Sequence, residues 1–195
     1  MEDRMKKLLS KPLLMVIDMQ NIYSNGQKWE CKNFGRAVDK IKSLLNSCNS
    51  EDVLFTRYIA SETPNGIWAD YNVENADVNA DVWSNEITKD LVGYSDRYKV
   101  IDKEVYSSLG NAEVKATTEL ASCVVVTGVV AECCVLSTVM SLIDEGIYVI
   151  YLKDAVAGAD DDTENAVVKV LEGLVPLHLS ILDTKEYMKL IKEVE

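Results

Sequence analysis

The sequence is poor in basic residues, since 20 Lys and Arg stand against 32 Asp and Glu and the formal net charge is −12. A protein that binds nucleic acid or an anionic membrane surface needs a basic face, so this balance argues against both kinds of partner. Long apolar runs are also missing, and none reaches the roughly 20 residues that a membrane-spanning helix needs. The charge balance does not restrict a small-molecule substrate, because the acidic residues can lie anywhere on the surface.

The chain also lacks a regular cysteine framework, and its first residues do not predict a leader segment. Its five cysteines are an odd number without regular spacing, which is typical of reduced thiols inside the cell. The segment 1–11 is too polar for a secretory signal peptide, so we expect a cytoplasmic protein. No stretch rich in Pro, Gly or Ser divides the chain, and we expect one domain over residues 1–195 with a full-sized core.

Strand patterns and helix patterns alternate along the chain. Apolar runs predict buried strands at 12–18, 51–58, 98–102, 123–127, 147–152 and 174–181. Helix patterns lie at 33–48, 85–92, 111–121, 133–145, 160–171 and 183–194. This alternation predicts a three-layer, Rossmann-like α/β fold, with a mostly parallel six-stranded sheet and helices on both faces. The stretch 59–84 has no sustained period and is expected to be a long irregular loop, of a kind that often carries binding groups.

Three chemically active side chains follow the ends of predicted strands. Asp18 ends the first apolar run, Lys103 follows the third, and Cys134 lies beyond the run that closes at Gly128. Sites in parallel sheets form at the carboxyl ends of the strands, so we expect these three residues on one rim. A strand-end acid such as Asp18 is more commonly a turn or helix cap, and that interpretation stays open at this point.

An acid, a lysine and a cysteine at a tight turn together form a coherent nucleophilic site. A cysteine at a helix start lies in the positive end of the helix dipole, which favours the thiolate. The thiolate would attack a carbonyl carbon, Asp18 would relay the thiol proton to the leaving group, and Lys103 would lower the pKa of the cysteine. The residues alone do not decide whether Cys133 or Cys134 is the nucleophile.

Three motifs in a fixed order carry a resemblance to a known family. They are LMVIDMQN at 14–21, KEVYSS at 103–108 and TGVVAECCV at 127–135, and Asp154-Ala155 after the next predicted strand also fits. Together they resemble the isochorismatase-like cysteine hydrolase family, which includes nicotinamidases, N-carbamoylsarcosine amidases and ureidoacrylate amidohydrolases. The resemblance spans nearly the whole chain and implies the isochorismatase-like hydrolase fold.

The resemblance implies a role for each central residue of these motifs. The family cysteine precedes a valine and stands six positions after the motif glycine, which makes Cys134 the nucleophile and Cys133 a packing residue. Asp18 is then the general acid and base, and Lys103 its electrostatic support. The Val129–Val130 bond is expected to be cis, and the N–H groups of Val130 and Cys134 are expected to form the oxyanion hole.

Departures from the family pattern bear on the metal and on the reaction. Ala131 and Glu132 stand where many members have Thr-Asp. Nicotinamidases place an Asp-x-His and further histidines after the second strand to bind a divalent metal, but this chain reads FTRYIASE at 55–62. The one histidine, His178, falls in the last predicted strand and is expected to be a packed core or edge residue. We therefore expect no catalytic metal and no other cofactor, which counts against a standard nicotinamidase.

The resulting expectation is a metal-independent cysteine hydrolase that cleaves a C–N bond of a small amide, carbamoyl or ureido compound through an acyl-enzyme. The isochorismatases proper lack the cysteine, so Cys134 counts against that activity. The alternative is a catalytically silent family member that acts as a small-molecule-binding or interaction module. A homo-oligomer, a dimer or a tetramer, is expected because members of the family commonly form them.

The substrate pocket is expected to use residues near these motifs. Arg57 could hold a carboxylate, while Tyr23 and Trp68 could cover a flat group. Gln20 and Tyr106 lie inside two of the motifs and are expected to line the same pocket.

Overall fold

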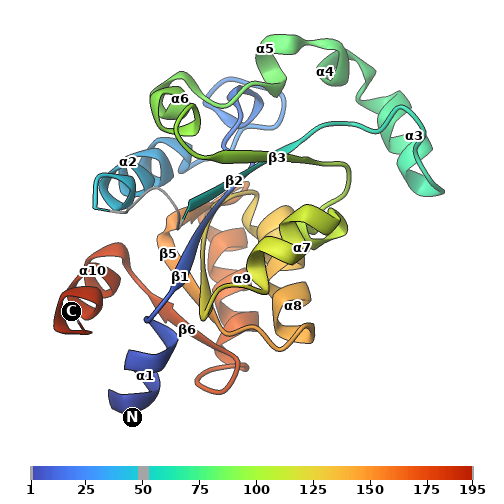
Figure 1. The fold of residues 1–195 in the computed structure, drawn as a ribbon. Coiled ribbons are helices and arrows are strands. Elements are labelled where there is room, and N and C mark those ends of the chain that lie inside the picture. Colours follow the sequence, from blue (N-terminus) through green and yellow to red (C-terminus); the bar gives the residue numbers. More distant parts are fainter. Residues whose placement is uncertain (1, 48–52, 195) are drawn as a thin grey trace.

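Six parallel strands form one sheet in the computed structural model, which describes residues 2–47 and 53–194. The strands are β1 (Pro12–Ile17), β2 (Val53–Tyr58), β3 (Lys99–Lys103), β4 (Cys123–Val129), β5 (Val149–Ala157) and β6 (Leu179–Leu182). Their order in the sheet is β3-β2-β1-β4-β5-β6, and every pairing is parallel (Figure 1). The predicted fold class is confirmed.

Helices cover both faces of the sheet. The apolar cluster on one face joins α1 (Glu2–Leu8), α2 (Phe34–Leu45), α6 (Lys89–Ser95) and α10 (Thr184–Val194) to the strands. The cluster on the other face joins α7 (Ala112–Thr118), α8 (Leu136–Asp144) and α9 (Asp161–Glu172) to the strands, and Figure 1 shows these three helices on one side of the sheet. The molecule is thus a three-layer α/β/α sandwich.

The central strands explain why the apolar runs are continuous. Successive side chains of a strand point to opposite faces, so Leu14 and Val16 join one cluster while Met15 and Ile17 join the other. Each of these four side chains is almost completely buried. A strand covered on both faces has no polar side, and this produces the unbroken apolar run at 12–17.

The segment 59–84 is more regular than its sequence predicts. It contains α3 (Ile67–Glu74) and α4 (Ala76–Ala80), and α5 (Val82–Asn85) follows directly. Figure 1 shows these three helices as an arm that runs along one end of the molecule. None of the residues of α3 is buried, and this helix therefore does not need an apolar stripe. The sequence shows no helical period here for that reason. The prediction of an irregular loop is wrong.

Several element boundaries differ from the prediction. The strand predicted at 147–152 continues as β5 to Ala157, so Asp154 lies inside it. The last strand begins only at Leu179, and His178 is an exposed turn residue, which corrects its expected packed position. Cys48 and residues 51–52, at the ends of a predicted helix and strand, lie outside the described residues. No helix in the described ranges is long and apolar enough to cross a membrane.

Candidate active site

Asp18, Lys103 and Cys134 meet at the carboxyl ends of the central strands. Lys103 Nζ lies 2.7 Å from Asp18 Oδ2, and both side chains are completely buried. The same ammonium group donates to Cys134 Sγ at 3.4 Å and to the Val105 carbonyl at 2.9 Å. The three N–H donors of an ammonium group are thus matched by three acceptors. The structure brings together the three residues that the strand ends predicted on one rim.

Asp18 is held in place through the neighbouring strand. Its N–H donates to the Thr56 carbonyl at 3.1 Å, and Thr56 Oγ1 donates to Asp18 Oδ1 at 2.8 Å. Apart from its contact with Lys103, Oδ2 accepts no hydrogen bond within the described part of the chain. The backbone of Asp18 has a φ of 51°, a left-handed conformation that Asp and Asn adopt more readily than other non-glycine residues. One carboxylate oxygen is anchored, and the other remains able to accept a proton.

Gly128 lets strand β4 approach β1 closely beside Asp18. Its φ is 108°, and a Cβ placed on it would lie 2.1 Å from the carbonyl oxygen of Ile17. Only a residue without a side chain fits this position. One residue further along, the Val129–Val130 peptide bond is cis. The chain then leaves the sheet toward Cys134.

Cys134 lies in a π-helical turn, Ala131–Val135, that leads into α8. The N–H groups of Cys133 and Val135 both donate to the Val130 carbonyl, each at 3.1 Å. Cys134 is 3% exposed, whereas Cys133 is only partly buried. The turn therefore directs Cys134, rather than its neighbour, to Lys103.

Burial dominates the titration of the Cys134 thiol. It raises the pKa of Cys134 well above the usual value, the charge of Asp18 raises it further, and the charge of Lys103 lowers it. This direction is opposite to the one that the helix start favours, because the desolvation of a thiolate outweighs the nearby positive charge. Burial lowers the pKa of Lys103, but Asp18 and Cys134 raise it overall, so the lysine is protonated. The resting site consists of an ion pair beside a neutral thiol.

A cluster of aromatic rings lies beside Lys103. The centroid of the Trp29 ring lies 5.8 Å from that of Tyr23 and 6.3 Å from that of Tyr58. The Tyr58 ring lies 5.6 Å from Lys103 Nζ, within the range of a cation–π contact. Trp68 lies 6.2 Å from Tyr58 and 4.9 Å from Tyr106. The predicted Tyr23, Trp68 and Tyr106 thus belong to one aromatic cluster, which contacts Lys103 through Tyr58.

Two of the predicted pocket residues have other partners. Arg57 binds the carboxylate of Asp102 through two hydrogen bonds, of 2.7 and 2.9 Å. Because side chains alternate along β2, Arg57 lies on the opposite face from Thr56 and Tyr58, so the structure does not bring it to Lys103.

Gln20 is buried and fully engaged with the backbone. Its amide nitrogen donates to the carbonyls of Tyr58 and Asn85, at 3.0 and 2.9 Å, and its amide oxygen accepts from the Tyr58 N–H at 2.8 Å. These bonds tie the end of β1 to the end of β2 and to α5. Gln20 positions the surrounding loops, which differs from the substrate contact expected of it.

Three residues of the site did not emerge from the sequence. Thr56 and Tyr58 are separated by one residue in β2, and this period of two is the signal that places them on the face of Asp18 and Lys103. Trp29 lies in a loop between β1 and α2, and no pattern in its segment distinguishes it from a surface tryptophan. Its role as the centre of the aromatic cluster depends on contacts with remote segments, including Tyr71 of α3 at 6.3 Å.

The residues near the triad do not form a set of metal ligands. Across residues 2–47 and 53–194, no group of three or more His, Cys, Asp and Glu side chains converges as a cation site would require. Thr56 and Arg57, at the end of β2, are committed to Asp18 and Asp102. The donor set does not fit the divalent metal of the nicotinamidases.

The chain is similar to known proteins in both sequence and fold. The model of the Isochorismatase domain matches residues 12–183. The structure of a cysteine hydrolase from Pseudomonas syringae pv. phaseolicola 1448A superimposes with a TM-score of 0.80 at 20% identity, covering 96% of this chain and 95% of that one. A nicotinamidase from Bacillus subtilis gives a TM-score of 0.70 at 16% identity, covering 87% and 99%. A pyrazinamidase of Pyrococcus horikoshii in complex with zinc gives 0.66 at 19% identity, covering 89% and 99%. No curated protein sequence matches the chain.

Proposed function

Because the chain belongs to the Isochorismatase domain family, we propose that it is a cysteine hydrolase that cleaves a C–N bond of a small amide, carbamoyl or ureido compound. Cys134 is the nucleophile, Asp18 the general acid and base, and Lys103 the fixed positive charge. One observation carries the proposal: a single buried ammonium group lies 2.7 Å from the carboxylate and 3.4 Å from the thiol. A carboxylate and a lysine are seldom buried unless they are paired, and this pair adjoins a thiol.

The neutral thiol makes Asp18 necessary for attack. Cys134 Sγ forms a bond to the carbonyl carbon as its proton moves to Asp18 Oδ2, and the electron pair of the C=O bond moves to oxygen. The N–H groups of Val130 and Cys134 stabilise this oxyanion, and each such donor contributes roughly 3 kcal/mol in acyl transfer. The C–N bond then breaks as Asp18 returns the proton to the leaving nitrogen, which leaves a thioester on Cys134.

Water completes the cycle by the same route. Asp18 takes a proton from the attacking water, the C–S bond of the tetrahedral intermediate breaks, and the proton returns to Cys134. The product is a carboxylic or carbamic acid. At no stage does the site need to exchange a proton with bulk solvent, because Asp18 stores it between the steps.

Lys103 supports the reaction by its charge. Moving the proton from Cys134 to Asp18 exchanges one anion for another, and the ammonium group contacts both. Its interaction with the carboxylate is replaced by an interaction with the developing thiolate, so the buried positive charge is never left unpaired. This exchange offsets the burial that raises the pKa of Cys134.

A hydrolysis screen over small amides and ureido acids, read as ammonia release, tests the function. Cys134→Ala and Asp18→Asn are expected to abolish release, whereas Cys133→Ala retains most of it because that side chain does not contact Lys103. Equal loss from the two cysteine substitutions would contradict the assignment of the nucleophile. Release that disappears on dialysis against a chelator and returns with zinc would contradict metal independence. Saturable binding of a substrate without turnover would favour the silent binding module instead.

A further inference from the structure

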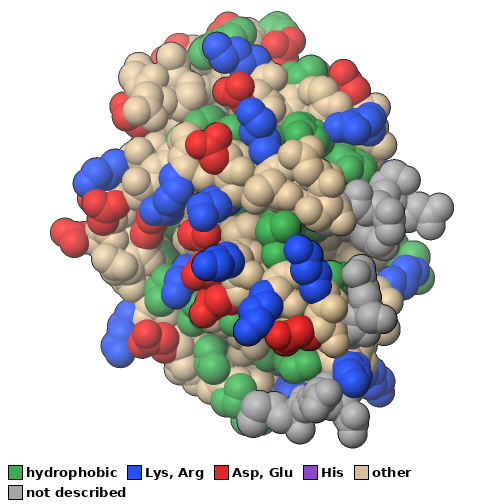
Figure 2. All heavy atoms as spheres, turned by 90° about the vertical axis from the view of Figure 1, so that its left-hand side faces the viewer, with side chains coloured by type: hydrophobic (Ala, Val, Ile, Leu, Met, Phe, Trp, Pro, Cys, Tyr) green, Lys and Arg blue, Asp and Glu red, His purple; other side chains and the backbone are tan. Residues whose placement is uncertain are grey.

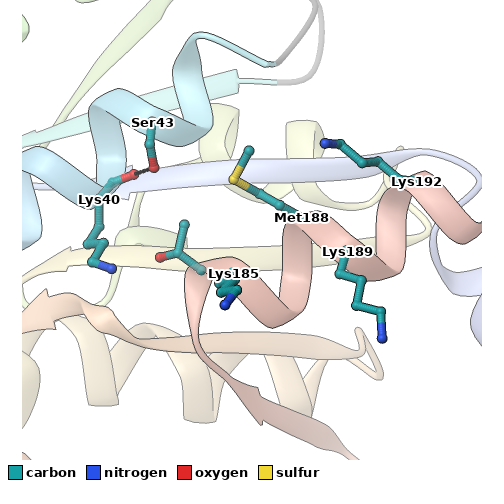
Figure 3. A pocket seen from close by; sticks show the side chains of 7 residues that line it. Lys40, Ser43, Lys185, Met188, Lys189 and Lys192 are labelled. Atoms are coloured by element: carbon teal, nitrogen blue, oxygen red, sulfur yellow. Dashed lines mark hydrogen bonds between the residues drawn. The ribbon is translucent and has the colours of Figure 1, made fainter.

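A groove lined by lysines lies between α2 and α10, on the face of the sheet away from α8. Its volume is about 400 Å³, and its lining consists of Lys40, Ser43, Thr184, Lys185, Met188, Lys189 and Lys192. In Figure 3, Lys40 and Ser43 project from α2, and the other labelled side chains project from α10, with Met188 between the two helices. No acidic side chain lines this groove among the residues that the structure describes.

This concentration of positive charge is unusual for such an acidic chain, whose net charge is −12. Lys185, Lys189 and Lys192 are spaced i, i+4 and i+7, so they share one side of α10. Like charges at this spacing disfavour a helix by a few tenths of a kcal/mol per pair. Figure 2 views the side of the molecule at the left of Figure 1, and basic side chains, interspersed with acidic ones, gather across its middle. The charged side chains that line the groove itself are all lysines.

Two of the four lysines have an acidic partner, and two do not. Lys40 Nζ lies 3.0 Å from Asp154 Oδ2, and Lys189 Nζ lies 3.6 Å from Glu193 Oε1. Lys185 and Lys192 are exposed and form no ion pair within 2–47 and 53–194. Two ammonium groups at the groove are therefore available to an anion without breaking an existing contact.

We propose that this groove binds a di- or triphosphate group, either free or as part of a nucleotide. Lysine ammonium groups are strongly hydrated point charges and common ligands of phosphate. Met188 and the aliphatic stems of the lysines provide an apolar floor, on which a flat ring attached to the phosphates can lie. The volume of the groove falls within the range of pockets that hold small ligands. This binding site goes beyond the proposed hydrolysis and does not depend on it.

Isothermal titration of the full chain with tripolyphosphate and with ATP, in about 0.15 M salt to screen weak surface contacts, tests the proposal. We expect saturable binding of one ligand per chain, weakened at least tenfold in Lys185→Gln/Lys192→Gln. The control Lys115→Gln/Lys169→Gln also removes two positive charges, but from α7 and α9 on the opposite face. Its dissociation constant should lie within twofold of that of the unchanged protein.

The two ligands distinguish the source of the phosphate chemistry. Tighter binding of ATP than of tripolyphosphate assigns the floor at Met188 to a nucleotide base, and equal binding assigns the groove to the phosphate chain alone. The proposal is overturned if neither ligand gives a saturable isotherm, or if the control variant loses as much affinity as the groove variant. Circular dichroism of both variants establishes that each is folded before the affinities are compared.

Discussion

The contributions of Lys103 and Asp18 to the free energy of unfolding should be strongly coupled. Two unit charges 2.7 Å apart attract by about 6 kcal/mol at an effective dielectric constant of about 20. Asp18→Asn keeps the shape, tolerates the left-handed φ of 51° and can still accept from Thr56, so it removes little but the charge. Lys103→Met removes the opposite charge at similar length. Each single substitution leaves one buried charge unpaired and should lower the free energy of unfolding by about 3–5 kcal/mol.

The double variant Asp18→Asn/Lys103→Met leaves no unpaired charge. It should therefore cost no more than about one of the single substitutions, which gives a coupling energy of about 3 kcal/mol or more. Urea unfolding of the four proteins, followed by circular dichroism, measures this cycle. Lys169 and Glu172 form the matched control, because this surface pair has a similar separation of 2.9 Å but side chains 82% and 53% exposed. Its cycle should give less than about 1 kcal/mol.

The reasoning is refuted if the costs of Asp18→Asn and Lys103→Met simply add. It is also refuted if their coupling disappears in 1 M salt, because salt screens exposed charges far more than buried ones.

Three further outcomes follow from the geometry. Gly128→Ala should prevent folding or cost more than about 3 kcal/mol, because the new Cβ would lie 2.1 Å from a backbone oxygen. Gly146→Ala is the control: its φ is 77° but the space around it is open, so it should cost only about 1 kcal/mol. Equal losses of the free energy of unfolding in urea would contradict this contrast. Arg57→Gln should leave kcat/KM for any substrate found within about twofold, because its guanidinium binds Asp102; a tenfold loss would return Arg57 to the pocket. Burial raises the pKa of Cys123 to about 12, so the contribution of this thiol to stability is complete below its unfolded pKa near 9 and is lost as the pH rises toward 12. Between pH 9 and 11, the free energy of unfolding of Cys123→Ala should therefore fall less steeply than that of the unchanged protein, by about 1.4 kcal/mol per pH unit. Identical slopes for the two proteins would contradict this.

The sheet and the convergence of the triad could be predicted because each depends on local patterns. The buried strand β1 appears as an apolar run, and a strand that alternates with helices must end on the same rim as its neighbours. The placement of Asp18 and Lys103 on one rim follows directly from this rule. Only the family resemblance distinguishes Cys134 from Cys133. The π-helical turn that buries one thiol and leaves the other partly exposed has no sequence signature of its own.

The surroundings of the triad could not be predicted, because they depend on which face of the sheet each side chain occupies and on remote segments. Arg57 sits next to Tyr58 in sequence, yet alternation along β2 sends the two to opposite faces. The pKa of Cys134 depends on burial and on the charges of Asp18 and Lys103, which come from remote segments of the chain. The aromatic cluster around Trp29 likewise draws its members from four separate segments. Short helices such as α3 carry no apolar stripe, so periodicity could not reveal them.

The burial of Cys134 also bears on how the protein withstands oxidants. Peroxides and alkylating agents react with the thiolate, and a thiol that is 3% exposed with a raised pKa offers little of it. Cys133 is the more accessible of the two neighbours, although burial raises its pKa as well. On exposure alone, chemical damage to this pair of cysteines should begin at Cys133, the residue that the proposed mechanism does not use.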